Sequence, residues 1–335
     1  MTADSPTAGT ASPTSGTIPG TAPAPPVLAE VVRSGFVEGH HRGALVLLEA
    51  DGSVRRAVGD VTSPVYPRSS NKPMQAAAAL RAGAALTGPR LALAAASHAG
   101  EEFHQRLVRE MLADAGLDET ALGCPPDLPL DRPAAEAQLA AGHGRTRTAM
   151  NCSGKHAGML TACVAAGWST ADYLDPGHPL QQLIRESVEA ATGEPVAHTG
   201  TDGCGAPLLA FSLTGLARAF RSYVLAAPGT PGRQVADAMR AHPEYVAGTR
   251  QTDTAVMRAV PGALAKAGAE GVQALALPDG RALAFKIEDG NSRARGPVLA
   301  AALAGLGVEA AGLDGIAASP LLGGGRPVGA VRAVL

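Results

Sequence analysis

Lysine is rare in this sequence, and its neighbours suggest chemistry at three of the four positions where it occurs. The 335 residues include 28 lysines and arginines, of which only four are lysine. A lysine amine can lose its proton near neutral pH and act as a base, which a guanidinium cannot do. We therefore treat Lys72, Lys155 and Lys286 as candidates, while Lys266 has the least distinctive neighbours. A bias of the coding sequence toward arginine would instead leave all four as ordinary surface residues.

Ser69 and Lys72 have the spacing of a serine nucleophile and a lysine base. Residues three apart lie on one face of a helix, so the hydroxyl and the amine could come within hydrogen-bond distance. A serine at a helix start also lies among free backbone N–H groups, which can stabilise an oxyanion. A second cation nearby, such as Lys286, would favour the neutral amine. The spacing is common, however, and Ser69 could equally be an ordinary helix N-cap.

Two cysteines also lie in polar, glycine-flanked segments. Cys152 begins the sequence Cys-Ser-Gly-Lys that ends at Lys155, and Cys204 lies between two glycines. Cys163 belongs to an apolar helical segment and is expected to be buried and inert. Four cysteines are too few and too far apart for a disulfide framework in a chain of this size.

The composition indicates a globular protein that does not bind nucleic acid or membranes. Hydrophobic residues make up 46% of the chain and the formal net charge is −2. Aromatic residues make up only 3%, and no basic run is present, so neither base stacking nor binding to an anionic surface is indicated. No stretch approaches the roughly 20 apolar residues of a membrane span.

The chain divides into a tail and one catalytic domain. Residues 1–26 are almost entirely Thr, Ala, Pro, Ser and Gly, so we expect a disordered tail followed by a domain over residues 27–335. The tail lacks the basic start and apolar core of a secretory signal, which favours a cytoplasmic location.

The elements that must position these residues form an α/β (α+β) pattern, with strands at both ends of the chain and helices in the middle. Pro278-Asp279-Gly280 is a strong hairpin signal. Alternation in the second strand of that hairpin would place Lys286 on a face with small alanines, inside a cleft if helices cover that face. We predict an antiparallel sheet built from both chain ends. The expected strands are 43–49, 53–58, 272–277, 281–288 and 327–334, and the expected helices are 73–86, 101–115, 158–166, 179–191, 206–224, 234–241 and 296–306.

Several separated motifs resemble the asparaginase II family. They include Arg68-Ser69-Ser70-Asn71-Lys72-Pro73 and Asn151-Cys152-Ser153-Gly154-Lys155-His156. Their order and their spread over about residues 28–335 make chance agreement implausible. The segments that carry the resemblance are 32–35, 38–43, 68–73, 97–104, 151–160, 201–207, 242–244, 268–271 and 286–290.

This resemblance implies a fold similar to that of serine β-lactamases and penicillin-binding enzymes, and hydrolysis of L-asparagine to L-aspartate and ammonia. It implies two Ser-Lys pairs, Ser69 with Lys72 and Ser97 with Lys286. Asp202 would form hydrogen bonds within the serine cluster and balance lysine charge. We expect Ser69 to attack the side-chain amide with Lys72 as base.

The resemblance further implies a zinc ion beside the active site and a homodimer. The residues that match the zinc ligands are Cys152, Lys155 and Cys204, and water could fill a fourth position. Because the Ser-Lys pairs already supply a nucleophile and a base, we expect zinc to tune substrate binding rather than to act as the electrophile.

Candidate substrate-binding residues are Arg33, Glu38, His41 and His98. The first three could bind the α-carboxylate or α-ammonium of an amino acid or could be a loop charge cluster, and Gly39 replaces the serine that is usual in the family. His98 could also simply pack within the site.

Two other classes of function fit the same residues. The fold and the Ser-x-x-Lys spacing could serve a glutaminase or a β-lactam-recognising enzyme, although no Lys-Thr-Gly triplet follows the hairpin. A non-catalytic amino-acid-binding protein would need no cluster of nucleophilic serines and lysines.

Overall fold

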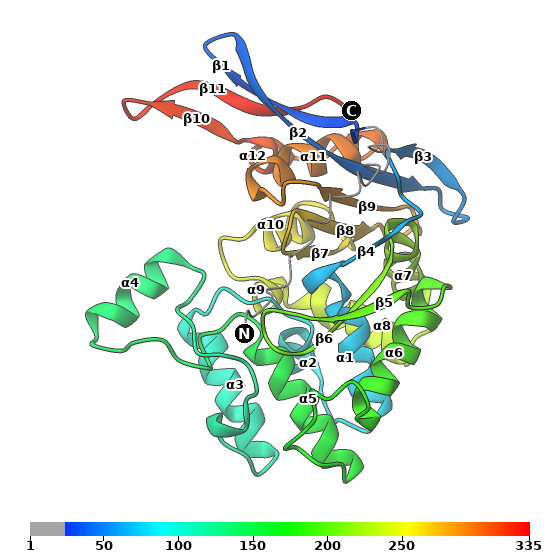
Figure 1. Ribbon diagram of the computed structural model, residues 1–335, viewed down its shortest axis with the longest axis vertical. Coiled ribbons are helices and arrows are strands. Elements are labelled where there is room, and N and C mark those ends of the chain that lie inside the picture. Colours follow the sequence, from blue (N-terminus) through cyan, green and yellow to red (C-terminus); the bar gives the residue numbers. More distant parts are fainter. Residues whose placement is uncertain (1–23) are drawn as a thin grey trace, which may run out of the picture.

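The computed structural model describes residues 24–335. Residues 1–23 of the predicted disordered tail therefore lie outside the described residues. Eight strands of the described region form one antiparallel sheet in the order β10-β11-β1-β2-β9-β8-β7, with β3 beside β2 (Figure 1). These strands are β1 (Val27–Arg33), β2 (Phe36–Leu48), β3 (Val54–Val58), β7 (Leu264–Gly268), β8 (Val272–Ala276), β9 (Ala282–Ile287), β10 (Pro320–Gly323) and β11 (Arg326–Ala333).

Both ends of the chain contribute to this sheet, as the sequence predicts. Strand β1 pairs with β2 on one side and with β11 on the other, where Val31 lies opposite Val331. The predicted hairpin at 278–280 joins β8 to β9. The predicted strand 43–49 is the second half of the longer β2. Its residues 45–48 are all buried, because α7 packs on one face of the sheet and α11 on the other.

Helices fill the middle of the chain and lie below the sheet in Figure 1. No helix within residues 24–335 is both long and apolar enough to cross a membrane. The helices are α1 (Lys72–Arg81), α2 (Gly88–Ala94), α3 (Glu102–Asp114), α4 (Arg132–Ala140), α5 (Ser153–Ala166), α6 (Pro179–Thr192), α7 (Leu213–Leu225), α8 (Pro231–Ala241), α9 (Pro243–Val246), α10 (Thr252–Ala259), α11 (Arg295–Gly305) and α12 (Leu313–Ala317), with short 3₁₀ helices η1 (Arg68–Asn71), η2 (Glu119–Ala121) and η3 (Ser292–Ala294).

The predicted helix 206–224 is wrong over its first part. Residues Pro207–Ser212 form strand β6, which pairs with β4 (Pro64–Val65) and β5 (His198–Thr201) in a second, small sheet. An apolar run of this length fits a buried strand or a buried helix equally well. The change of structure occurs at Ser212, whose hydroxyl accepts the Gly215 N–H and so caps α7.

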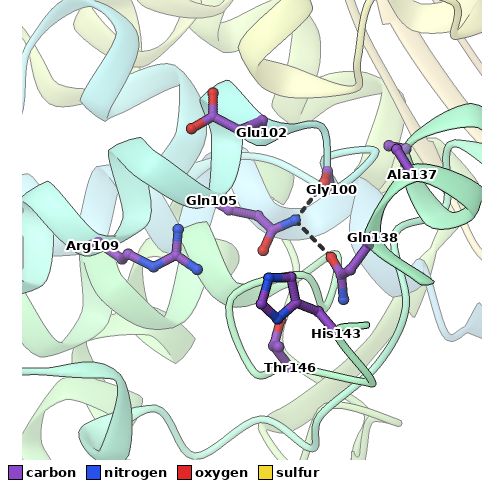
Figure 2. A pocket seen from close by; sticks show the side chains of 9 residues that line it. Gly100, Glu102, Gln105, Arg109, Ala137, Gln138, His143 and Thr146 are labelled. Carbon is purple, nitrogen blue, oxygen red and sulfur yellow. Dashed lines mark hydrogen bonds between the residues drawn. The ribbon is translucent and has the colours of Figure 1, made fainter. Parts of the chain in front are cut away.

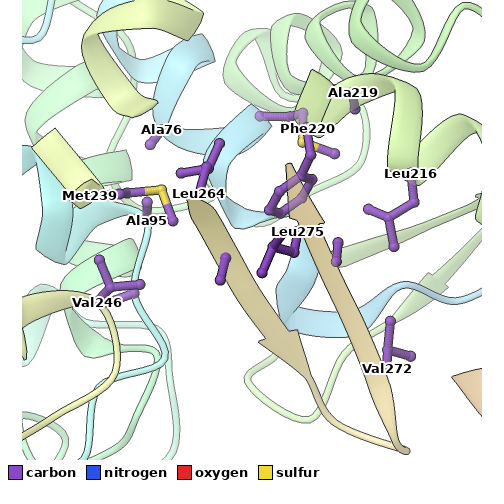
Figure 3. Close-up of a cluster of buried hydrophobic side chains, with 14 of the residues drawn as sticks. Ala76, Ala95, Leu216, Ala219, Phe220, Met239, Val246, Leu264, Val272 and Leu275 are labelled. Atoms are coloured by element: carbon purple, nitrogen blue, oxygen red, sulfur yellow. The ribbon is translucent and has the colours of Figure 1, made fainter. Parts of the chain in front are cut away.

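The hydrophobic core joins the large sheet to the helices (Figure 3). Leu216 and Phe220 of α7 are buried with Leu275 of β8, and Leu264 of β7 is buried with Met239 of α8. This packing fixes β7, an edge strand of the sheet, beside η1 and α10. The polar residues that these three elements carry therefore have fixed positions.

Candidate active site

A cavity of about 300 Å³ lies where η1, β7, α10 and the loop after α2 meet. Ser69 and Ser97 both line it, together with Lys266, Asp253 and Arg295. Two hydroxyls, an amine, a carboxylate and a guanidinium around a space of this size make it the best candidate for an active site in the described residues.

A larger cavity of about 430 Å³ lies between α3 and α4, but its chemistry is less suitable (Figure 2). Gln105 spans it by donating to the Gly100 carbonyl and to Gln138. Arg109 on its wall is already paired with Glu119. Neither a serine nor a lysine is part of its lining.

Ser69 lies within the first turn of η1, directly after a residue with unusual backbone geometry. Arg68 has a φ of 52°, in the left-handed region that non-glycine residues rarely adopt. Its guanidinium donates to Asp202 at 2.9 Å, which helps to hold this conformation. The adjacent Ser70 is buried and its hydroxyl donates to the Pro67 carbonyl, so Ser69 is the hydroxyl of the pair that reaches the cavity.

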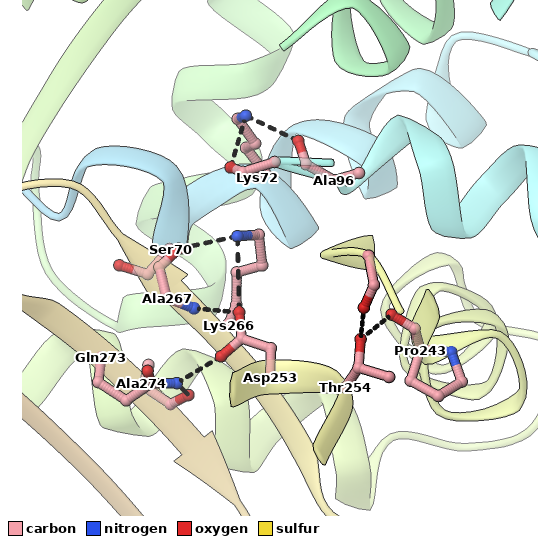
Figure 4. A network of polar contacts seen from close by, with 12 residues as sticks. Ser70, Lys72, Ala96, Pro243, Asp253, Thr254, Lys266, Ala267, Gln273 and Ala274 are labelled. Atoms are coloured by element: carbon pink, nitrogen blue, oxygen red, sulfur yellow. Dashed lines mark hydrogen bonds and ion pairs between the residues drawn. The ribbon is translucent and has the colours of Figure 1, made fainter. Parts of the chain in front are cut away.

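Lys72 begins α1 and is buried, with 1% of its surface exposed. Its amine donates to the Ala96 carbonyl at 2.7 Å (Figure 4). It also donates to the Ser97 hydroxyl at 2.8 Å and to the Cys152 sulfur at 3.1 Å. In the described residues the serine hydrogen-bonded to Lys72 is therefore Ser97 rather than Ser69. The same amine also connects the cavity to the candidate metal ligands.

Lys266 is a site residue, although its neighbours in the sequence are the least distinctive of the four lysines. It lies on β7, is 1% exposed, and donates to the Ala267 carbonyl at 2.8 Å, with Asp253 at 3.8 Å (Figure 4). Burial lowers the pKa of Lys266 to about 7, although Asp253 opposes the shift. The sequence does offer one signal for this position, because Lys266 is the only charged residue in the run 263–269.

Lys286, by contrast, does not line the cavity. It lies on β9 and its amine donates to the carbonyls of Glu270, at 2.8 Å, and Ile287, at 3.2 Å. Burial lowers the pKa of Lys286, as expected for a partly covered amine. Within residues 24–335 the structure brings Ser97 to Lys72, and it places Lys266 rather than Lys286 in the cavity with Ser97.

Asp202 contacts the serine cluster indirectly. Its carboxylate accepts hydrogen bonds from Arg68 and from the Gly203 N–H, both at 2.9 Å. No hydrogen bond joins it to Ser69 or Ser97 in the described part of the chain. It lies two residues before Cys204, so the Arg68–Asp202 ion pair ties the Ser69 turn to the Cys204 turn.

The three predicted metal ligands converge below Lys72. Cys152 and Cys204 are both buried, and the Lys155 amine donates to the Cys204 sulfur at 3.0 Å. Hydrogen bonding to Cys152 and the charge of Lys155 lower the pKa of the Cys204 thiol, while the same hydrogen bond raises the pKa of the Cys152 thiol. Cys204 is therefore the thiol of the pair that ionises more readily, and the Lys155 amine lies beside it.

This set of donors fits a zinc ion. Two thiolates and a neutral amine in a buried pocket are ligands that Zn²⁺ accepts, and the Lys155 ammonium stands in the structure where a cation would be expected. No group of three His, Cys, Asp or Glu side chains in residues 24–335 could hold a metal, so such a site depends on Lys155 as the third ligand.

The predicted substrate-binding residues lie away from the cavity lining. Arg33 and Glu38 form an exposed ion pair, at 2.8 Å, on the β1–β2 hairpin. His41 contacts Asp289 at 2.7 Å and accepts a hydrogen bond from Arg293 at 2.9 Å. His98 is fully buried, where its ring accepts the Gly100 N–H and contacts the Ser153 hydroxyl at 2.8 Å. Burial lowers the pKa of His98 well below its usual value, so it packs beneath the site as a neutral ring.

Comparison with known proteins gives one family and several distant structures. A family model described as L-asparaginase II matches residues 29–333. No curated protein matches the chain. The solved structures that are similar to it include three that we describe.

A putative β-lactamase from Bacteroides dorei is 18% identical, with 78% of this chain and 92% of that one covered and a TM-score of 0.43. A β-lactamase from Mycobacterium bovis is 15% identical, with 79% and 95% covered and a TM-score of 0.44. A hydrolase with promiscuous acyltransferase activity is 13% identical, with 75% and 90% covered and a TM-score of 0.40.

Proposed function

The chain belongs to the L-asparaginase II family, and we propose that it is a serine amidohydrolase that converts L-asparagine into L-aspartate and ammonia. The observation that carries this proposal is the hydrogen bond between the Lys72 amine and the Ser97 hydroxyl, beside a cavity that Ser69 also lines. A buried lysine in contact with a serine hydroxyl is an arrangement that activates a nucleophile without a histidine.

In the proposed acylation step, Ser69 attacks the side-chain amide carbon of the substrate. The Ser69 proton passes by way of the Ser97 hydroxyl to the Lys72 amine, which is hydrogen-bonded to Ser97. The C–N bond then breaks, and the leaving nitrogen takes a proton from Lys72 through the Ser97 hydroxyl and departs as ammonia. Ser69 lies in the first turn of η1, where backbone N–H groups can stabilise the oxyanion.

Lys266 suits the second half of the reaction. It lines the cavity, and its pKa of about 7 leaves a large fraction of the amine neutral at neutral pH. In the proposed deacylation step, Lys266 takes a proton from water and the resulting hydroxide attacks the acyl carbon. The bond to Ser69 then breaks, and the Ser69 oxygen takes back the proton that Lys266 accepted. Aspartate is then released.

A zinc ion, when bound by Cys152, Lys155 and Cys204, would supply a positive charge beside the cavity that strengthens binding of an anionic substrate group. The residues themselves already connect the two places, because Lys72 contacts both Cys152 and Ser97. The metal would thus influence the position of the Lys72 amine.

The test is ammonia release from L-asparagine and L-glutamine by the wild type and by Ser69→Ala and Ser97→Ala, with zinc content measured on the same samples. We expect turnover of L-asparagine that falls on the order of a thousand-fold or more in Ser69→Ala. Full activity in Ser69→Ala with loss in Ser97→Ala would make Ser97 the nucleophile. No turnover of either amide by folded, zinc-loaded protein would refute the proposed function.

A further inference from the structure

Arg295 lies at the wall of the candidate active site and has no counterion among residues 24–335. It begins α11 and lines the same cavity as Ser69, Ser97 and Lys266. Its Nε atom is buried and has no hydrogen-bond partner within residues 24–335. No salt bridge joins Arg295 to an acidic side chain in this described part of the chain.

Other arginines near the site are already paired, which sets Arg295 apart. Arg68 donates to Asp202, Arg250 forms an ion pair with Asp131, and Arg293 donates to His41. Asp253 is the carboxylate that lines the same cavity, but other donors occupy it. It accepts hydrogen bonds from the Ala267 N–H at 2.7 Å and from Gln273 at 3.0 Å, and it lies 3.8 Å from Lys266.

A buried guanidinium nitrogen without an acceptor is costly, so its retention at a cavity wall indicates that a ligand satisfies it. A guanidinium presents parallel N–H donors whose geometry matches a carboxylate. The proposed substrate carries one carboxylate besides the amide that reacts, and this is its α-carboxylate. The hydroxyls that would attack the amide line the same space of about 300 Å³.

We propose that Arg295 binds the α-carboxylate of the substrate and thereby selects α-amino acid amides over simple amides. This assignment rests on the proposed function, and it makes Arg295 a residue of substrate specificity. It replaces Arg33, which is engaged with Glu38 on an exposed hairpin, as the carboxylate-binding arginine.

The test compares L-asparagine with 3-aminopropanamide, which has the same side-chain amide and amino group but lacks the α-carboxylate. In Arg295→Gln we expect KM for L-asparagine to rise about 10- to 100-fold with a smaller change in kcat, because a hydrogen-bonded charge contact is lost from binding. Turnover of 3-aminopropanamide should stay at its wild-type rate, so the preference between the two substrates collapses. Arg295→Lys should recover part of the preference, because it keeps the charge without the paired donors.

The control is Arg258→Gln on α10, which removes an exposed ion pair with Glu244 of α9. It should leave the preference for L-asparagine unchanged, since exposed ion pairs contribute little. An equal loss on both substrates in Arg295→Gln, or no loss on either, would overturn the assignment.

A binding experiment separates this inference from the proposed function. Calorimetric titration with L-aspartate and with β-alanine reports the α-carboxylate contact without any turnover. If the wild type hydrolyses neither amide but prefers L-aspartate at least tenfold, and folded Arg295→Lys reduces that preference, the function fails and the Arg295 site stands. If the wild type shows no preference between the two ligands, the Arg295 site is wrong whatever the activity.

Discussion

Lys72 and Lys266 both lie near Ser69 and Ser97, but their amines have different surroundings. Lys72 donates to three acceptors, whereas Lys266 donates to one carbonyl and lies 3.8 Å from a carboxylate. Its hydrogen bonds hold Lys72 in place, whereas burial lowers the pKa of Lys266. The two residues therefore suit different steps of one reaction.

The first prediction concerns the pH dependence that Lys266 imposes. The ammonium form cannot accept a proton from water in deacylation, so kcat should fall as pH drops below about 7 and level off above it, given the lowered pKa of Lys266. Asp253→Asn removes the negative charge that favours the ammonium, so the midpoint should move to lower pH. The measurement is the pH profile of ammonia release for both proteins. A midpoint that stays in place in Asp253→Asn would exclude Lys266 as the titrating group.

The second prediction concerns the metal ligands. Removing zinc with a chelator should raise KM for L-asparagine more than it lowers kcat, because the nucleophile and the base remain in the cavity. Cys204→Ser should lower the zinc content, measured by atomic absorption, and reproduce the same split between KM and kcat. Complete inactivity that zinc restores would show instead that the metal takes part in the chemical step.

At the scale of elements, the site depends on how closely β7 approaches η1. A methyl group added to Gly268 would lie 2.4 Å from the Pro67 carbonyl oxygen and 3.2 Å from the Ser70 hydroxyl. Pro67 directly precedes the turn that carries Arg68 and Ser69. The absence of a side chain at Gly268 thus sets the distance between the Lys266 strand and the Ser69 turn.

The third prediction follows from this contact. Gly268→Ala should lower the free energy of unfolding by about 1–3 kcal/mol, because overpacking forces the backbone apart. It should also reduce kcat at least tenfold, since Lys266 and Ser69 then move relative to each other. Gly315→Ala in α12, where a methyl group would meet no atom within 4 Å, is the matched control; it should leave kcat unchanged and should not lower the free energy of unfolding, because alanine favours the helix. Wild-type activity in Gly268→Ala would contradict the argument.

How far the sequence predicts this site depends on the distance along the chain between its parts. The Ser69 turn and the Cys152-to-Lys155 segment are local motifs, so their residue types and spacing mark them as candidates. The Lys72–Ser97 contact and the place of Lys266 depend on how α2 and β7 pack against α1 and η1, which no local pattern encodes. Lys286 satisfied every local criterion, yet the register of β9 directs its amine to the carbonyls of Glu270 and Ile287.

The same distinction applies to the fold. The hairpin at 278–280 and the helix at 179–191 have strong turn and periodicity signals, and both are present. The local pattern predicts helix for strand β6, because an apolar run of this length fits either structure and one of its two partners, β4, comes from a segment far away in the chain. Its pairing partners, rather than its own residues, determine its structure.

At the scale of the whole molecule, the residues just before strand β1 form hydrogen bonds with strand β2. The Pro25 carbonyl accepts a hydrogen bond from Arg42 at 2.9 Å, and the Pro26 carbonyl accepts the Gly43 N–H at 3.0 Å. These contacts mark where the domain begins to depend on the segment that the composition assigns to a tail.

The fourth prediction compares two truncations. A chain that starts at Ala24 should keep full activity and the same melting temperature, because residues 1–23 offer almost no large apolar surface to a core. A chain that starts at Val27 loses the two carbonyl acceptors and should melt a few degrees lower with activity retained. Calorimetry and ammonia release decide the outcome, and lost activity in the first truncation would give the tail a role in folding or assembly.

The pairing of β1 with β11 has a consequence for how the protein is made. During synthesis on a ribosome, strand β1 emerges long before its partner β11, so Val31 cannot pair with Val331 until late in synthesis. Contacts so distant in sequence slow folding, and they leave one edge of β1 open to other chains in the meantime. The nascent chain therefore cannot complete its sheet until β11 has emerged from the ribosome, and a chaperone that shields this edge would raise the yield of folded protein.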